Sequence, residues 1–182
     1  MFCNRSLWSV SAILLAIGLA SLPALPGVRP ARKFKILHIL PGYTDAGLVP
    51  DSAGNLYGTT LDGGVYGTGT VFELTRGSKG RWTEQVLHDF EGGNDGEAPY
   101  ASPILDTAGN LYGTTCYGGV SGNGTVFELT LTNGKWTDRV LYQFTGGKDG
   151  SQPWSGLILD ATGNLYGTTL DEGISKTVPL FS

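Results

Sequence analysis

The chain has 182 residues, a formal net charge of −4 and 15% charged side chains; 29 residues are glycine and 40% are hydrophobic. We expect no nucleic-acid partner, because the net charge is negative and no basic cluster interleaves with aromatic residues. The hydrophobic share argues against disorder, and the glycines lack the three-residue period of collagen. Since glycine supplies the positive-φ positions of tight turns, this composition favours short strands joined by many turns.

Residues 1–24 have the three-part layout of a secretory signal peptide. Arg5 lies in a short polar start, an apolar run extends from Leu7 to Leu22, and small residues offer cleavage near Ala20 or Ala24. The run is short for a membrane span of about 20 residues, although an uncleaved anchor is the alternative. We therefore expect export, to the cell surface, the periplasm or the medium, with residues 25–33 as a linker.

One seven-residue segment, Gly-Asn-Leu-Tyr-Gly-Thr-Thr, occurs three times. It begins at Gly54, Gly109 and Gly163, so the offsets are 55 and 54 residues. A fixed period of this kind indicates a repeat architecture, in which each unit buries its apolar face only against its neighbours. A residue found at the same place in every unit therefore more often builds the unit than forms a single site.

Each period contains four strand-like segments, and the middle unit has them in their clearest form. There they are residues 103–105, 110–115, 125–129 and 136–144. An Asp-x-x-Gly turn joins the first two segments, a glycine-rich connection the next two, and an Asn-Gly dipeptide typical of tight hairpins the last two. Four antiparallel strands per period predict an all-β fold, an incomplete β-propeller-like array of four-stranded units.

The last segment of the middle unit alternates between polar and apolar residues. We expect Trp136, Val140, Tyr142 and Phe144 to share one face, with Leu141 as an exception.

Three linked motifs carry a resemblance to a known family. Asp-x-x-Gly-Asn-Leu-Tyr-Gly-Thr-Thr is followed by Gly-Thr-Val-Phe-Glu-Leu, and then by Trp-Thr, Val-Leu and Phe before Gly-Gly-x-Asp-Gly. Over residues 34–173 this series resembles the GloVer-type tandem repeat of exported bacterial "choice-of-anchor" proteins, and its opening is similar to NHL-like propeller blades. The resemblance implies an exported, propeller-forming surface protein of unassigned biochemistry.

The period places units near 52–106 and 107–160, with partial units at 34–51 and 161–182. After Asp171 the expected Gly-Thr-Val-Phe-Glu-Leu is replaced by Lys-Thr-Val-Pro-Leu-Phe, so we expect a truncated fragment of a longer repeat protein. The outermost units would leave apolar faces uncovered, and self-association is the predicted result. Those faces are expected to include Phe72, Leu74, Val126 and Phe127.

Acidic residues and histidines recur in register, which favours structural roles. Asp51, Asp106 and Asp160 open the Asp-x-x-Gly turns and are expected to accept hydrogen bonds within those turns. A second set, Asp45, Asp95 and Asp149, could bind calcium, but each loop offers one certain carboxylate, since Glu97 is matched by Ser151. His38 and His88 are equivalent to Tyr142, and no histidine accompanies a nucleophile motif.

Three further features have simple interpretations. Cys116 aligns with Leu61 and Leu170 and is expected to be an apolar filler. Tyr100 and Trp154 are equivalent residues that could stack on sugar rings, although core packing is the expectation. The glycines near Gly63 and Gly118 lack the strand-to-helix context of a phosphate loop, and the Asn123 glycosylation sequon matters only in a eukaryotic secretory pathway.

The sequence predicts no catalytic residues, no metal site and no cofactor. We expect an exported, non-catalytic repeat protein that acts as a binding or structural module, with a glycan or a protein as its ligand. The alternative is a fragment of an exported propeller enzyme, such as a polysaccharide lyase or glycosidase. That alternative needs paired carboxylates specific to one unit.

Overall fold

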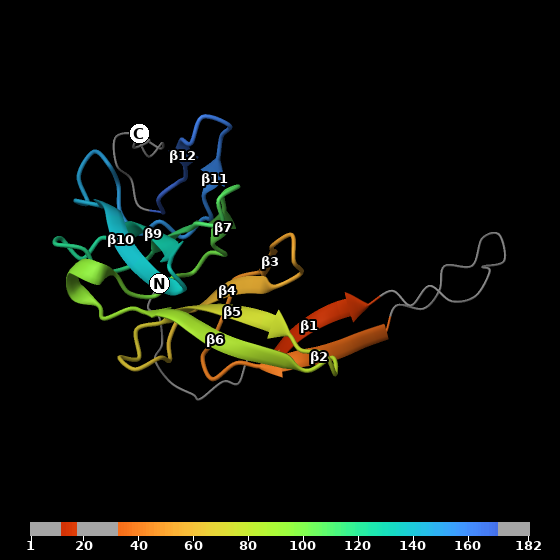
Figure 1. Cartoon of the computed structure of the whole chain (residues 1–182). Helices are drawn as coiled ribbons and strands as arrows, with labels where there is room; N and C mark the ends of the chain where they lie inside the picture. Colours follow the sequence, from red (N-terminus) through yellow and green to blue (C-terminus); the bar gives the residue numbers. More distant parts are fainter. Residues whose placement is uncertain (1–11, 18–32, 171–182) are drawn as a thin grey trace, which may run out of the picture.

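The computed structural model describes residues 12–17 and 33–170, and this part of the chain is β structure with one 3₁₀ turn, Gly93–Asp95 (Figure 1). Two four-stranded antiparallel sheets have the strand orders β3-β4-β5-β6 and β7-β8-β9-β10, and β1-β2 and β11-β12 form two-stranded sheets. The strands are β1 (Ala12–Ile17), β2 (Lys33–Ile39), β3 (Val49–Pro50), β4 (Leu56–Thr60), β5 (Thr70–Arg76), β6 (Trp82–Asp89), β7 (Ile104–Leu105), β8 (Leu111–Thr115), β9 (Thr125–Thr132), β10 (Lys135–Gln143), β11 (Ile158–Leu159) and β12 (Leu165–Tyr166). The all-β class and the four-stranded antiparallel units predicted from the sequence are confirmed.

Consecutive sheets pack against one another, and an apolar cluster fills each of the three interfaces. The first cluster lies between β2 and the β3–β6 sheet, the second between the two four-stranded sheets, and the third between the β7–β10 sheet and β11–β12. Their most buried members are Leu40, Leu56, Phe72 and Leu74 in the first, Tyr57, Val71, Phe90, Leu111, Phe127 and Leu129 in the second, and Val126, Phe144, Leu157 and Leu165 in the third. Each unit thus buries its faces against its neighbours, as a repeat architecture requires.

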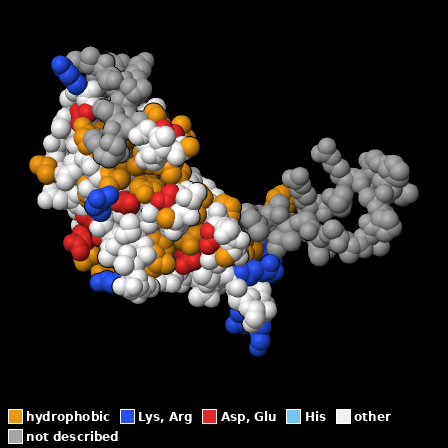
Figure 2. All heavy atoms as spheres, turned by 45° about the horizontal axis from the view of Figure 1, so that its top comes forward, with side chains coloured by type: hydrophobic (Ala, Val, Ile, Leu, Met, Phe, Trp, Pro, Cys, Tyr) orange, Lys and Arg blue, Asp and Glu red, His pale blue; other side chains and the backbone are white. Residues whose placement is uncertain are grey.

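The expectation that the complete units leave apolar faces open is wrong for the residues named. Phe72, Leu74, Val126 and Phe127 are at most 2% exposed. The β2 segment packs over Phe72 and Leu74, and β11–β12 pack over Val126. Phe127 lies between the two complete sheets. Some large apolar side chains are exposed on the complete units, among them Val65, Val86 and Leu131, and Figure 2 shows hydrophobic side chains at the surface of one face of the molecule. Others lie on the partial units, on both sides of the array. They are Phe34, Ile36 and Ile39 at one end and Ile158, Tyr166 and Leu170 at the other.

A β-bulge in the fourth strand of each unit explains the exception to the alternation. Phe127 pairs with Val140 and Val126 with Tyr142, so Leu141 is an extra residue in β10. Because one inserted residue reverses the side-chain alternation, the two ends of the strand face opposite sides of the sheet. Trp136 consequently packs toward the preceding sheet and Phe144 toward the following one, which corrects the prediction that they share a face.

The glycine in the repeated segment makes room for an aromatic ring on the next strand. A Cβ atom on Gly113 would lie 2.5 Å from the ring of Phe127, and one on Gly58 would lie 2.5 Å from the ring of Phe72. In both sheets glycine and phenylalanine are directly paired. The segment therefore uses glycine for close packing within the sheet.

Within the described residues, none of the secondary structure is a helix long and apolar enough to cross a membrane.

Candidate functional site

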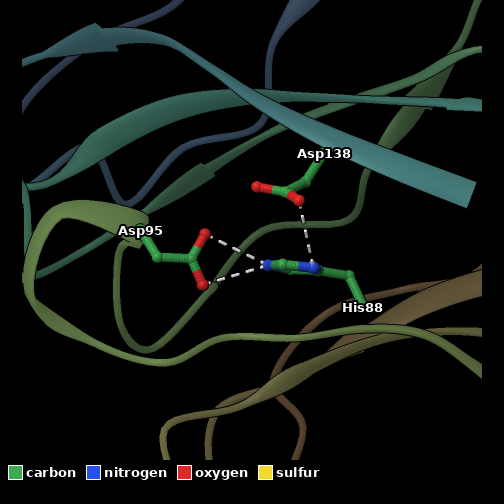
Figure 3. Close-up of side chains that lie close together, drawn as sticks. All are labelled: His88, Asp95 and Asp138. Atoms are coloured by element: carbon green, nitrogen blue, oxygen red, sulfur yellow. Dashed lines mark hydrogen bonds and ion pairs between the residues drawn. The ribbon is translucent and has the colours of Figure 1, made fainter.

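One cluster of titratable side chains joins the two complete units. The ring of His88, near the end of β6, lies between Asp95 in the 3₁₀ turn and Asp138 on β10 (Figure 3). His88 Nε2 is 3.1 Å from an Asp95 oxygen, and Nδ1 is 3.9 Å from an Asp138 oxygen. The cluster thus connects the fourth strand of one unit with that of the next.

The surroundings of His88 favour its protonated form. Burial by itself lowers its pKa, but the hydrogen bond to Asp95 and the charges of Asp95, Asp138 and Asp89 outweigh burial, so the pKa is raised. The ring also meets Phe90 edge-on, with centroids 4.7 Å apart. These contacts fix the imidazole in a partly buried position between two sheets.

The same side chains suit an ion-pair bridge better than a metal centre. Their ligand atoms lie within 4.8 Å of one another. However, the two carboxylates approach opposite nitrogens of the ring, whereas a metal needs its ligands to converge on one point. Asp95 also accepts the backbone N–H of Glu91 at 2.7 Å, so its carboxylate already closes the turn.

Equivalent contacts recur along the array. His38 Nε2 on β2 lies 2.8 Å from Glu84 on β6, at the positions that correspond to His88 and Asp138. In the next unit the hydroxyl of Tyr142 donates to Asp149 at 2.9 Å, as His88 does to Asp95. Both Asp95 and Asp149 therefore serve their own turns and the fourth strand, while Asp45 is exposed.

The aspartates of the Asp-x-x-Gly turns accept hydrogen bonds from within their own turns, as the sequence predicted. Asp106 Oδ1 accepts the backbone N–H groups of Ala108 and Asn110, both at 2.8 Å. Burial alone would raise the pKa of Asp106, but the bonds from Asn110 and Ala108 outweigh it and hold the pKa below its usual value. Asp51 and Asp160 make the corresponding bonds to Asn55 and Asn164.

A tyrosine connects each of these turns to the third strand of its unit. The Tyr112 hydroxyl lies 3.2 Å from Asp106 and 3.0 Å from Glu128. Burial, followed by the hydrogen bond to Glu128, raises the pKa of Tyr112 to about 12. Arg139 binds the other oxygen of Glu128 through two nitrogens, at 2.6 and 3.0 Å. Tyr57 lies in the same way between Asp51 and Glu73.

The loops at one end of the sheets form a continuous surface, which we call the loop face. It comprises residues 40–48, 61–69, 90–103, 116–124 and 144–157. Ala98 connects neighbouring units here, because its N–H donates to Thr68 at 2.9 Å and its carbonyl accepts from Cys116 at 3.0 Å. Ala98 and its equivalent Gln152 have φ values of 55° and 53°, which residues other than glycine rarely adopt. The backbone hydrogen bonds therefore hold a strained backbone conformation at these positions.

Two aromatic rings stack on the loop face. Tyr100 and Trp154 lie with centroids 4.8 Å apart and planes 3° from parallel, and Trp154 is 41% exposed. The expectation of core packing is therefore wrong for Trp154, whereas Tyr100 is half-buried. Equivalence in the sequence did identify the two residues, but only the stacking of consecutive units brings them together.

Sequence reasoning missed the contacts between units. Repeat alignment shows that Glu84 matches Asp138 but does not show that each faces a histidine of the preceding unit. Cys116 is fully buried, and Glu97 forms an isolated bridge with Tyr117, so neither lies with the His88 cluster.

A search of curated proteins finds no match to the chain. The sequence does match the family described as Gloeobacter/Verrucomicrobia repeat over residues 29–182, which include both complete sheets. With its repeated turns, tyrosines and glycine–phenylalanine pairs, the chain belongs to the Gloeobacter/Verrucomicrobia repeat family.

Proposed function

We propose that the protein is an exported, non-catalytic module that binds carbohydrate through its loop face. The stacked Tyr100–Trp154 pair carries this proposal. The C–H face of a pyranose ring packs well on an aromatic face, and the outer part of Trp154 is open to solvent. The N-terminal segment supports export, because its polar start, apolar run and small residues fit a signal peptide.

The rigidity of the loop face supports a binding role. Gln152 donates its N–H to Asn123 at 2.8 Å and accepts from Leu170 at 3.0 Å, which repeats the arrangement at Ala98. A surface held by backbone bonds loses little entropy when a ligand binds. Exposed apolar side chains on other loops, Tyr43, Val65, Tyr66 and Val120, extend the surface beyond Trp154.

The use of the carboxylates supports a non-catalytic role. A glycosidase needs two carboxyl groups with separate acid and base or nucleophile roles on either side of the scissile bond. In the described residues, Asp106 and Glu128 hold Tyr112, while Asp95 and Asp138 hold His88. These acids serve the fold and recur from unit to unit.

The test is a glycan array with the purified exported protein, compared with the Trp154→Ala variant. We expect binding to polysaccharides that weakens at least about tenfold in Trp154→Ala, since the stacking surface is lost. Leu131→Ala is the matched control, because Leu131 is 52% exposed on β9 at the end of the sheet away from the loop face. Equal binding by all three proteins would contradict the proposed site.

A hydrolase and lyase screen on the same protein tests the non-catalytic role. We expect no turnover. Turnover abolished by Glu128→Gln or Asp138→Asn would establish the enzymatic alternative.

A further inference from the structure

The stacked rings occupy one position of the repeat, and a landmark on either side defines that position. Before it, a backbone carbonyl accepts the N–H of the residue that follows the repeated Gly-Asn-Leu-Tyr-Gly-Thr-Thr segment, at 2.7, 3.0 and 3.0 Å for Tyr43, Ala98 and Gln152. After it, the aspartate of the Asp-x-x-Gly turn comes eight residues beyond that carbonyl in every unit. Two residues beyond the carbonyl the chain has Asp45, Tyr100 and Trp154.

Asp45 thus has the place of the aromatic residue in the partial unit. Its loop is five residues shorter than the next one, since Asp51 follows Leu40 by 11 positions and Asp106 follows Phe90 by 16. The missing residues are those of the turn that Asp95 closes. The alignment of Asp45 with Asp95, which the sequence motif suggested, is therefore wrong.

Equivalent residues of consecutive units lie side by side in this part of the loop face. Two positions further along, Ser102 Oγ donates to the carbonyl of Gly47 at 3.0 Å, and a Cβ atom on Gly156 would lie 3.8 Å from the carbonyl oxygen of Ser102. The stacked rings follow the same order, with centroids 4.8 Å apart. Asp45 consequently lies next to Tyr100, on the side away from the second ring.

The carboxylate of Asp45 differs from the other aspartates of the loop face. Asp95 and Asp149 accept backbone N–H groups in their own turns, and Asp62 accepts the backbone N–H of Tyr43 at 2.6 Å. Asp45 is exposed, and its side chain makes no hydrogen bond or ion pair within residues 33–170. Its acceptor atoms are therefore available to a ligand that stacks on the neighbouring rings.

The charge of the whole loop face narrows the class of carbohydrate. Its five loops contain six carboxylates and a single lysine, Lys148, so their formal charge is −5. A surface of one sign repels ligands of the same sign and attracts those of the opposite sign. Polyuronates and sulfated glycans are thus disfavoured, and a glycan that carries amino groups is favoured.

We propose that the loop face binds an oligosaccharide with unsubstituted amino groups, which stacks on Trp154 and pairs an ammonium group with Asp45. This inference rests on the proposed carbohydrate binding and adds the ligand class. An ammonium group is a compact cation with three donors, and a carboxylate is its natural acceptor. Asp45 lies beyond Tyr100 as seen from Trp154, so one sugar cannot reach both side chains. The ligand is therefore a chain of several sugar units.

The experiment compares two oligosaccharides that differ only in this amino group. Oligomers of glucosamine and of N-acetylglucosamine, equal in length, are titrated into the purified protein by calorimetry at slightly acidic pH, where the amino groups are charged. Acetylation removes the charge and keeps the ring face for stacking. We expect the glucosamine oligomer to bind at least about fivefold more tightly, with a preference that shrinks as salt is added. A polyuronate should not bind.

Substitution of Asp45 tests the assigned position. Asp45→Asn should reduce the preference to about twofold or less and leave binding of the N-acetylglucosamine oligomer unchanged, whereas Trp154→Ala should weaken both ligands. Glu91→Gln is the matched control, because it removes one charge from the same face. Glu91 follows β6 and Asp45 precedes β3, at opposite edges of one sheet and three strand spacings, about 14 Å, apart. Since Asp45 has no partner to lose, unchanged denaturation curves of Asp45→Asn should confirm an intact fold.

The possible failures are distinguishable. Equal, Trp154-dependent binding of the two oligomers, or binding of a neutral or uronate polymer in their place, overturns the amino-sugar ligand and leaves carbohydrate binding intact. An equal loss of preference in Asp45→Asn and Glu91→Gln overturns the role of Asp45. If no oligosaccharide or polysaccharide binds, the proposed function itself is wrong.

Discussion

The sheet β7–β10 and the pair β11–β12 have the same turn and the same second-strand sequence, yet their side chains lie in different surroundings. Cys116 is fully buried and its equivalent Leu170 is 56% exposed. Tyr112 lies between two carboxylates, whereas Tyr166 bonds only to Asp160 among the acids described. The third strand, β9, makes the difference, because it supplies Glu128 and the packing over the second strand. In this chain the local motif forms the turn, and the third strand buries the side chains of the second strand.

Among the substitutions that test the role of the third strand, loss of its aromatic ring should lower the stability of the complete unit most. Phe127→Ala removes a side chain that is 1% exposed and that meets Phe90 in the cluster between the complete sheets. We expect the free energy of unfolding to fall by about 3–5 kcal/mol, from lost burial and the cavity left behind. Chemical denaturation followed by tryptophan fluorescence measures the change. Leu131→Ala on the same strand is the control and should stay within about 0.5 kcal/mol.

Filling the space beside that ring should also destabilise the unit, though by less. Gly113→Ala places a Cβ atom 2.5 Å from the Phe127 ring, and the cost of such overpacking is about 1–3 kcal/mol. Gly156→Ala is the control, because its Cβ would meet its nearest neighbour at 3.8 Å. Equal stability of the two variants would show that the glycine–phenylalanine pair does not require close packing.

The turns and the four strands could be predicted because they depend on residues close together in sequence. Asp106, Gly109 and Asn110 define the turn locally, and the structure has it where the pattern indicated. The direction of Trp136 and Phe144 could not be read from alternation, because a single inserted residue, Leu141, reverses it. Leu141 was visible as an exception, and its equivalents Leu37 and Leu87 lie in the other fourth strands.

Contacts between units were beyond a single-sequence prediction for a different reason. The pairing of His88 with Asp138 and of Tyr100 with Trp154 depends on how consecutive sheets stack. Residue type and repeat period carry no direct information on how one sheet is oriented against the next. The burial of Phe72 by β2 was missed likewise, because a partial unit was not expected to cover a complete one.

Removing the hydroxyl of the turn tyrosine should affect stability differently in the complete and the partial unit. Tyr112→Phe leaves Asp106 and Glu128 without the hydroxyl between them, and we expect a loss of about 1–2 kcal/mol. Tyr166→Phe should lower the free energy of unfolding by less. Tyr166 is more exposed, and Asp160 is its single hydrogen-bonded acid among the described residues. Denaturation curves of the two variants measure the difference, and a larger effect at Tyr166 would contradict the role assigned to β9.

The same tyrosine should titrate late. The pKa of Tyr112 is raised to about 12, so its stabilising contribution is complete below pH 10 and is lost as pH rises through about 12. Absorbance at alkaline pH should show late-ionising phenols, and Tyr112→Phe should reduce the amplitude of this signal without removing it, because burial and Glu73 also raise the pKa of Tyr57.

The smallest effect is expected at His88, where the complete units meet. Its folded-state pKa is raised above 6.5, because Asp95, Asp138 and Asp89 together outweigh burial. A raised histidine pKa means that the stabilisation is complete below the unfolded-state value and is lost as pH rises through the folded-state value. We therefore expect the free energy of unfolding to decrease from slightly acidic to slightly alkaline pH. His88→Gln should remove most of this dependence, because glutamine can donate to Asp95 but carries no charge. Asp138→Asn should reduce it only in part, since Asp95 at 3.1 Å is the closer partner. Denaturation curves at several pH values measure these slopes, and an unchanged slope in His88→Gln would place the titrating group elsewhere.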